Sequence, residues 1–349
     1  MIMKKLLTTL IVIFLTATGY AQEVPNTLRY KLKDHTTVDI RLSELQEIKK
    51  IGNISMRNIF IDGAQESTEF LLDDIESIDF VYKEYAPDDN LNINLETYAR
   101  RLEIPHLNAY GDKNLFIEHS TQTYGVTYAL EWDCNKKSQR WTAYQFHNGI
   151  PNNNVGRTGN WKDDPDIPAA YRSHDDDYYK SGFSRGHMCM SNDRQSSEEQ
   201  NKQTFYISNA HPQYQKHNGG LWQTLENVVN KWGNDASFRD TLYVVKAGTI
   251  DKDEDILAYT NSEKTSAHLP VPKYFYMAIL CLKNGQYKAI GFWTEHTNVS
   301  ITKAKAADYA ISIRELEELT GIDFFCNLPD DIEAEVEAAY TLGDWGLNP

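Results

Sequence analysis

The dipeptide Asn284-Gly285 constrains the fold of this chain more strongly than any other short feature of the sequence. It joins residues 273–282 to residues 286–294, and both runs have the composition of β-strands. A two-residue Asn-Gly connection favours a type I′ turn, whose twist matches a pair of antiparallel strands. We therefore expect a long β-hairpin in the C-terminal part of the chain.

Two further strands and two amphipathic helices are expected around this hairpin. Residues 138–146 and 241–247 have strand composition, and the second run is typical of a buried strand. The apolar faces of the two helices consist of Leu221, Trp222, Leu225, Val228, Val229 and Trp232, and of Ile313, Leu316 and Leu319. Gly321 suits the end of the second helix. Because strands and helices do not alternate regularly, we expect an α+β fold.

The first residues have the pattern of a secretory signal peptide. Lys4 and Lys5 precede an apolar run over 6–17, and small residues up to Ala21 follow it. The run is too short to span a bilayer as a helix, so cleavage after Ala21 is favoured over an uncleaved anchor. We therefore expect residues 1–21 to be removed and the mature protein to be secreted or periplasmic.

Export decides how the four cysteines are interpreted. In an oxidising compartment they would form up to two disulfides, with three possible connectivities. None of them has C-x-x-C spacing, which disfavours a zinc knuckle. The four are Cys134, Cys189, Cys281 and Cys326.

Residues 22–85 are predicted to form a separate small β-rich module. Within it, residues 38–48 resemble residues 68–78, and both copies alternate apolar and polar residues as strands do. A linker is expected over 86–109. The main domain is expected over 110–345, where Trp, Tyr and His become frequent.

Candidate catalytic residues gather in three short segments of the main domain, 184–194, 204–213 and 218–226. Hydrolysis of a phosphodiester needs an activated water and a counter-charge for the pentavalent oxyanion. The neutral imidazole of His187 could take the proton of that water near pH 7. The guanidinium of Arg185 would lie on the same side of an extended segment and could bind the phosphate.

A hard divalent cation would neutralise the phosphate and help the leaving oxygen depart. Mg²⁺ keeps several waters and takes few protein ligands, so Asn218 could hold it. Gly219 and Gly220 should delay the following helix until about Leu221, which leaves Asn218 in the preceding turn. Glu226, on the helix itself, could reach a metal-bound water. The alternative is that Asn218 merely caps the helix.

The three segments resemble the motifs of the DNA/RNA non-specific endonuclease family. Those motifs are Asp-Arg-Gly-His, Ser-Asn-x-x-Pro-Gln and Asn-x-x-x-Trp-x-x-Leu-Glu. Further similarity lies at 271–275 and 316–325, so the resemblance covers roughly residues 110–345. The matching motif residues are Arg185, Gly186, His187, Ser208, Asn209, Pro212, Gln213, Asn218, Trp222, Leu225 and Glu226.

This resemblance implies a central antiparallel sheet with flanking helices and a ββα-metal finger, or His-Me finger, as the active site. It implies His187 as general base, Asn218 as direct ligand of Mg²⁺ or its substitute Mn²⁺, and Glu226 as a group near the metal. Arg185 would contact the phosphate, and Asn209 would support the site. The implied substrates are DNA and RNA, cut with little sequence preference to leave 5′-phosphate ends.

The sequence departs from the family pattern at two positions. Ser184 replaces the leading Asp, which removes a carboxylate beside the metal. The upstream family arginine falls on Gly159, and Arg157 is expected to substitute for it. In addition, the formal net charge of −15 disfavours a broad basic surface, although a local cationic groove is compatible with it.

Two other functions stay open on the sequence. One is a nuclease-like module that binds nucleic acid or glycan with weakened catalysis, as Ser184 and the acidic charge would allow. The other is a phosphoesterase for small phosphodiesters. A homodimer and an unidentified partner of the N-terminal module are further possible interactions.

Two alternative metal sites are disfavoured. A zinc site that joins His187 to other histidines lacks any common ligand spacing. The acidic run 175–177 is interpreted as a solvated loop rather than a calcium site. The histidines of the zinc alternative are His174, His211 and His217.

Overall fold

The computed structural model describes residues 27–34, 36–41, 45–51, 54–60, 68–81, 93–94, 96–107, 114–301 and 303–348. The chain divides into two compact units, Met1–Pro87 and Asp88–Pro349. The predicted signal peptide lies outside the described residues. Among the helices of the described residues, none has both the length and the apolar character needed to cross a membrane.

The N-terminal unit contains two antiparallel sheets of three strands each, in the orders β2-β1-β6 and β3-β4-β5. Side chains from both sheets pack on a small core around Leu28, Tyr30 and Ile40. The strands are β1 (Thr27–Leu32), β2 (Thr37–Arg41), β3 (Leu45–Ile51), β4 (Ser55–Phe60), β5 (Thr68–Leu71) and β6 (Ile75–Val81). The first copy of the sequence repeat therefore supplies β2 and β3, and the second copy supplies β5 and β6.

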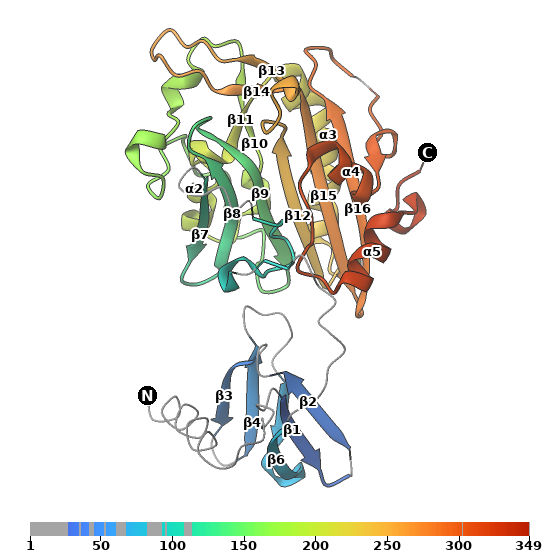
Figure 1. Ribbon diagram of the computed structural model, residues 1–349. Coiled ribbons are helices and arrows are strands. Elements are labelled where there is room, and N and C mark those ends of the chain that lie inside the picture. Colours follow the sequence, from blue (N-terminus) through green and yellow to red (C-terminus); the bar gives the residue numbers. More distant parts are fainter. Residues whose placement is uncertain are drawn as a thin grey trace, which may run out of the picture. The chain divides into compact units, whose positions relative to one another are not determined.

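The larger unit is built on a seven-stranded sheet in the order β17-β16-β15-β12-β9-β8-β7 (Figure 1). All neighbouring strands are antiparallel, which confirms the α+β class with a central antiparallel sheet. The strands are β7 (Asn114–Thr121), β8 (Gly125–Asp133), β9 (Ser138–His147), β12 (Thr241–Gly248), β15 (Tyr274–Lys283), β16 (Gln286–Glu295) and β17 (Ala310–Ile311).

The predicted hairpin is present as β15 and β16, which pair from Tyr274 with Glu295 to Lys283 with Gln286. At the turn, Asn284 has φ of 50° and Gly285 has φ of 76°. Positive φ at both central residues is the requirement of a type I′ turn, which Asn and Gly meet at low steric cost. The hairpin prediction is therefore confirmed at its turn.

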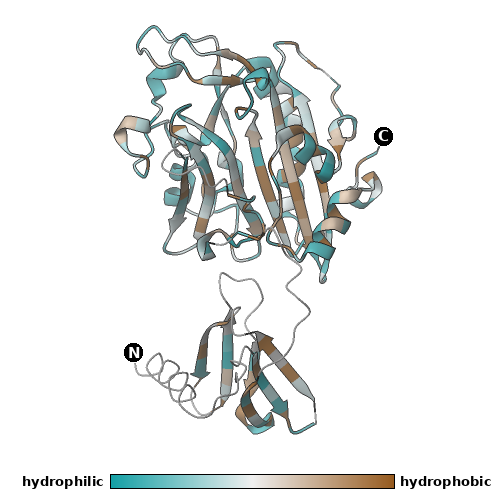
Figure 2. Ribbon diagram, in the orientation of Figure 1, coloured by the Kyte–Doolittle hydropathy of each residue, from teal (hydrophilic) through white to brown (hydrophobic). Residues whose placement is uncertain are grey.

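Both faces of the sheet are covered, so its strands are apolar on both sides. Along β9, Tyr144 and Phe146 belong to one core, whereas Trp141 and Ala143 belong to the other. This alternation follows from the two-residue period of a strand. Figure 2 shows the resulting apolar character of the central strands β12 and β15.

Each face is covered by different helices. On the first face, α3 (Gln223–Asn234) buries Leu225 and Val229 against the sheet. On the second face, α4 (Ile313–Thr320) and α5 (Asp330–Ala338) contribute to the other core. The predicted end of α4 is confirmed, because Gly321 has φ of 71° in the left-handed region.

The segment before β7 differs from the expected linker over 86–109. Within its described part, Ala99 and Ile104 are fully buried in the core on the α4 and α5 face. Asn94 also donates to the carbonyls of Ala99 and Pro105, at 3.0 and 3.1 Å. These residues are thus packed parts of the larger unit, because their apolar side chains complete its core.

The disulfide prediction is not supported. All four cysteines are free and buried. Three of them lie in the core on the α3 face, where they pack as small apolar groups, and Cys326 is buried near the opposite core.

Candidate active site

The pocket is bounded by a short β-hairpin and by the helical segment that leads into α3. β10 (Ser184–His187) pairs antiparallel with β11 (Ala210–Gln213), so that His187 lies opposite Ala210 at the end of β10. A side chain at position 186 would displace that of Gln213, since a Cβ atom on Gly186 would lie 1.9 Å from its Oε1. Further short elements around this hairpin are α2 (Glu198–Gln203), β13 (Ile256–Tyr259) and β14 (Pro270–Pro272).

Asn218 lies in a π-helical turn, His217–Trp222, directly before α3. Gly220 has φ of −123° and ψ of −105°, which interrupts the helical geometry, so the regular helix begins at Gln223. The segment is already helical from Gln215, so the expected start at about Leu221 is wrong: Gly220 marks a kink within the helical segment and Asn218 lies on the turn before it. Asn218 does not cap α3; its Nδ2 donates to Oγ of Ser184 at 3.2 Å.

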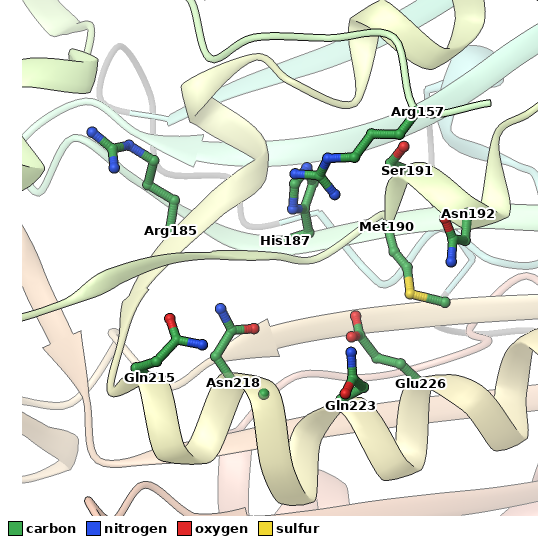
Figure 3. A pocket seen from close by; sticks show the side chains of 11 residues that line it. Arg157, Arg185, His187, Met190, Ser191, Asn192, Gln215, Asn218, Gln223 and Glu226 are labelled. Atoms are coloured by element: carbon green, nitrogen blue, oxygen red, sulfur yellow. The ribbon is translucent and has the colours of Figure 1, made fainter.

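The predicted catalytic residues meet in a single pocket of about 250 Å³. In Figure 3, Gln215, Asn218, Gln223 and Glu226 project from the helical segment toward the side of the pocket that carries His187 and the two arginines. This arrangement is the ββα finger that the resemblance implied. The lining residues are Arg157, Arg185, His187, Met190, Ser191, Asn192, Gln215, Asn218, Gly219, Gln223 and Glu226.

The His187 ring is held by aromatic contacts. Its centroid lies 4.3 Å from that of Trp161 and 5.0 Å from that of Phe205, whose ring is edge-on. The His187 Nε2 atom is shielded from solvent and has no hydrogen-bond partner in the described part of the chain. Burial, together with the nearby charges of Arg157 and Lys246, lowers the pKa of His187 to about 3. The imidazole is therefore neutral at physiological pH.

Arg157 and Arg185 approach the pocket from different segments. Arg185 forms an ion pair with Asp175 and donates to its carbonyl at 3.0 Å. Arg157 lies over the ring of Phe205, with 4.7 Å from Cζ to the centroid. No side chain fits at Gly159, because a Cβ atom there would lie 2.0 Å from the Phe205 ring. Arg157 itself lines the pocket, where it could take the role of the family arginine whose position is Gly159 in this chain.

Ser184 and Asn209 lie beside the pocket and hold its parts in place. The Ser184 hydroxyl donates to the carbonyl of Gln213 at 2.8 Å and accepts from Asn218. Asn209 is fully buried, and its side chain makes two hydrogen bonds to the backbone of Cys189. It accepts from the Cys189 N–H at 2.8 Å and donates to the Cys189 carbonyl at 2.7 Å. Asn209 thereby fixes the backbone that follows His187.

Glu226 lies over a buried ionic cluster that the sequence analysis missed. The Nζ atom of Lys246, on β12, lies 3.7 Å from Oε1 of Glu226 and 3.7 Å from Oδ2 of Asp193, and Lys246 is 0% exposed. Asp193 also accepts from the Tyr144 hydroxyl at 2.6 Å and from Asn230 Nδ2 at 2.8 Å. Burial raises the pKa of Glu226 to about 7, while Lys246 opposes that rise. Glu226 can therefore change its charge near neutral pH.

One signal for this cluster was present in the sequence. Lys246 interrupts the apolar run 241–247, and a lysine in a buried strand needs a carboxylate partner. The pattern does not say which carboxylate that is, since Asp193 and Glu226 are far from it along the chain. Gln215 and Gln223, which also line the pocket, carried no comparable signal.

The oxygen atoms at the pocket fit a hard divalent cation. Asn218 offers an amide oxygen, and Glu226 offers a carboxylate whose Oε1 is buried beside Lys246. Oxygen ligands and room for waters are what Mg²⁺ requires. The two groups of described His, Cys, Asp and Glu side chains that are close enough to share an ion both lie elsewhere, and neither contains His187.

The two alternative metal sites have structural explanations instead. His217 hydrogen-bonds to Gln213 at 2.8 Å, and His174 to Asp163 at 2.8 Å. In the acidic run, Asp176 pairs with Lys264 at 2.6 Å. The remaining histidine of the zinc alternative, His211, is fully buried and lies 3.3 Å from the Ser138 hydroxyl through Nδ1.

Comparison with known proteins identifies relatives of the larger unit. Residues 112–331 match the family model described as DNA/RNA non-specific endonuclease. The chain is 28% identical over 208 residues to the mitochondrial nuclease EXOG of Danio rerio, covering 57% of this chain and 59% of that protein. It is 24% identical over 218 residues to a nuclease of Serratia marcescens, covering 60% of this chain and 77% of that protein.

A solved structure shows the same fold. The crystal structure of an EndoG/EndoGI complex, which addresses EndoG inhibition, matches with a TM-score of 0.52 and 22% identity, covering 63% of this chain and 89% of that chain. The chain spans about three fifths of the length of the Danio rerio relative, 59%. With a family model that matches more than half of its length, and with the motif residues gathered in one pocket, the chain belongs to the DNA/RNA non-specific endonuclease family.

Proposed function

We propose that this protein is a metal-dependent endonuclease that hydrolyses the phosphodiester bonds of DNA and RNA with little sequence preference. One observation carries the proposal: His187, Arg157, Arg185, Asn218 and Glu226 line the same pocket. They supply a base, two phosphate-binding cations and two oxygen ligands. Because these groups address the phosphate backbone and not the bases, both nucleic acids are suitable substrates.

His187 acts as the general base. Its neutral imidazole can take a proton from the attacking water. A pKa of about 3 makes it a weak base in the free protein. A bound phosphate diester brings a negative charge into the pocket, which raises the pKa of His187 during the reaction. Trp161 and Phe205 keep the ring in place meanwhile.

Arg157 and Arg185 bind the phosphate oxygens. Arginine offers forked donors that match a phosphate, and both side chains line the same pocket, although the Arg185 guanidinium is paired with Asp175 in the free protein. They create a local positive site in a chain whose net charge is −15. That charge pattern suits an enzyme that holds a short stretch of backbone and then releases its products, which would carry 5′-phosphate ends.

Asn218 and Glu226 would hold Mg²⁺, Asn218 directly and Glu226 through water. When bound, this ion supplies counter-charge to the phosphate and stabilises the leaving oxygen. The hydrogen bond from Nδ2 of Asn218 to Ser184 orients the amide and leaves its oxygen available. Mn²⁺ should replace Mg²⁺, because it also accepts oxygen ligands.

The test is cleavage of plasmid DNA and RNA by the purified protein with Mg²⁺, with Mn²⁺ and with a chelator. His187→Ala should lower the rate by at least about 100-fold, the usual contribution of a general base. His174→Ala is the matched control, since His174 is exposed, pairs with Asp163 and lies outside the pocket. Full activity in the His187→Ala protein would exclude this assignment.

Binding without efficient cleavage is the second candidate function, which Ser184 favours because the family motif has Asp there. Ser184→Asp should raise activity if the missing carboxylate limits the metal site. Nucleic-acid binding by a wild-type protein that neither cleaves nor gains activity from Ser184→Asp would establish the second candidate. A chromogenic small diester, cleaved when polymers are not, would instead indicate a small-molecule phosphodiesterase.

We also propose that the mature protein acts outside the cytoplasm, on the signal-peptide pattern of residues 1–21. N-terminal sequencing of the protein recovered from the periplasm and the medium should begin at Gln22. Recovery of the unprocessed chain from the cytoplasm would contradict this. A homodimer stays a prediction, for which analytical ultracentrifugation is the direct measurement.

A further inference from the structure

Four carboxylates gather where α4 and α5 pack on the second face of the sheet. Glu317 lies on α4, Asp323 follows the end of α4, and Glu333 and Glu337 lie on successive turns of α5. Ligand oxygens of Glu317, Asp323 and Glu337 all lie within 4.8 Å of one another. Because α3 and the finger lie on the other face, this group is separate from the catalytic pocket.

Within this group, Glu337 is buried and one of its two oxygens is unpaired among the described residues. Glu337 is only 8% exposed, and Glu333 only 6%. The Oε1 atom of Glu337 is shielded from solvent and has no hydrogen-bond partner among the described residues. A buried carboxylate oxygen without a partner is costly unless a cation or a proton satisfies it.

Two groups lie beside these carboxylates, but neither satisfies Oε1 of Glu337. Arg314 lies near Glu317 and Glu337, but it is exposed and donates to the carbonyl of Ala334 at 3.2 Å. The N–H of Phe324 donates to Oε1 of Glu317 at 2.8 Å. In the described part of the chain the buried Oε1 of Glu337 therefore has no hydrogen bond, and a bound cation would satisfy it.

We propose that Glu317, Asp323 and Glu337 bind a calcium ion that ties α5 to α4. Calcium accepts oxygen ligands at about 2.3–2.6 Å, so ligands on opposite sides of it are up to about 5 Å apart. Ligand oxygens of the three residues lie within 4.8 Å of one another, so one ion of this kind can contact all of them. Calcium also accepts a flexible, irregular arrangement of ligands, whereas Mg²⁺ requires a near-ideal octahedron.

The donor set also excludes softer metals. All three ligands are carboxylates, which favour calcium, magnesium or manganese over zinc and copper. Cys326 lies nearby, but its sulfur contacts the carbonyl of Ile104 at 3.7 Å and the side chain of Asn94 at 3.4 Å, and it is not one of the clustered ligands. Glu333 contributes further negative charge beside the ion.

The test uses an Asn218→Ala protein, so that calcium bound at the catalytic pocket does not obscure the second site. Calorimetric titration with CaCl₂ should give one bound ion, with protons released on binding. At a calcium concentration of 100 times Kd, the Tm should rise by about 5 °C. Glu337→Gln in the same background should abolish both effects.

Glu335→Gln is the matched control, because Glu335 lies on the same helix but is exposed and outside the cluster. It should retain the calcium-dependent rise in Tm. If Glu337→Gln does not fold, Glu317→Gln takes its place. Absence of calcium binding in the Asn218→Ala protein, or an equal rise in Tm in Glu337→Gln, would overturn the proposal. These measurements do not involve nuclease activity, so they stand whether or not the chain cleaves nucleic acid.

Discussion

Two groups of buried carboxylates lie on opposite faces of the same sheet, and they obtain their counter-charge in different ways. Glu226 and Asp193, beneath the catalytic pocket, share the fully buried Lys246. Glu317 and Glu337, between α4 and α5, face the exposed Arg314. The buried Lys246 neutralises its partners whatever ions the solution contains. The exposed Arg314 neutralises its partners less completely, so the stability contributed by the second group should depend on the pH and on the ions in solution.

Lys246→Met gives the largest expected effect in this comparison. It removes the internal cation and leaves two buried carboxylates uncompensated, which should lower the free energy of unfolding by about 3–5 kcal/mol. Glu226 should then hold its proton at pH 7, so activity should fall about tenfold and recover in part at higher pH. Chemical denaturation and a pH–rate profile provide the measurements.

Lys264→Met is the control for that substitution. Lys264 also pairs with a carboxylate, Asp176, but both partners are about half exposed. An exposed pair contributes about 0–1 kcal/mol, so this change should be nearly neutral. Equal losses of stability in the two variants would mean that burial does not distinguish the two lysines.

A double substitution sharpens the interpretation of Lys246. Adding Glu226→Gln to Lys246→Met removes the buried carboxyl group that has to take up a proton when the lysine is gone, which should restore about 2 kcal/mol of stability. Activity should stay low, since the carboxylate near the metal is gone. Thermodynamic additivity of the two changes would show that Lys246 and Glu226 do not interact.

The two faces should also differ in the direction of their pH sensitivity. On the pocket side, His296 accepts from the N–H of Tyr214 at 2.7 Å through Nε2 and donates to the carbonyl of Pro272 at 2.7 Å through Nδ1, so it must be neutral. Burial lowers its pKa to about 4. The unfolded state therefore binds the proton first as pH falls below about 6.5.

Because of His296, the free energy of unfolding should fall by about 2 kcal/mol between pH 7 and pH 5. His296→Gln keeps a polar group at the site and removes the titration. Its stability should be lower at pH 7 but should fall less steeply toward pH 5 than that of the wild type. If the free energies of unfolding of the wild type and His296→Gln, measured with denaturant, fell equally between pH 7 and pH 5, the acid sensitivity would come from other groups.

The carboxylates on the second face should have the opposite effect. The raised pKa values of Glu317 and Glu337, about 8 and 9, mean that the folded state holds protons that the unfolded state has lost. Stability from these groups is present below about pH 4.5 and is lost as pH rises toward 9. In chelator, Glu337→Gln should be about 1 kcal/mol more stable than the wild type at pH 9. A wild type that is the more stable of the two at pH 9 in chelator would contradict this.

Local patterns predicted those parts of the fold and the site that depend on nearby residues. The Asn284-Gly285 turn and the end of α4 at Gly321 follow from backbone preferences, and the structure has both. Motif spacing likewise brought His187 and Asn218 to one pocket, because the hairpin and the helix start are joined by a short segment.

Features that depend on distant residues were not predictable in this way. The partners of Lys246 come from segments far apart in the chain, and only the folded sheet brings them together. The linker prediction failed because Ala99 and Ile104 have their core neighbours much later in the sequence. The exclusion of any side chain at Gly159 depends on the Phe205 ring, which lies on another segment.

The arrangement of strands in the N-terminal unit has a consequence for its evolution and engineering. Each copy of its sequence repeat gives one strand to either sheet, so neither copy contains a complete sheet. Half of the unit would expose unpaired strand edges and most of the core around Tyr30. The module should therefore be gained, lost or transplanted only as a whole, and truncations within it should give aggregation rather than a smaller folded piece.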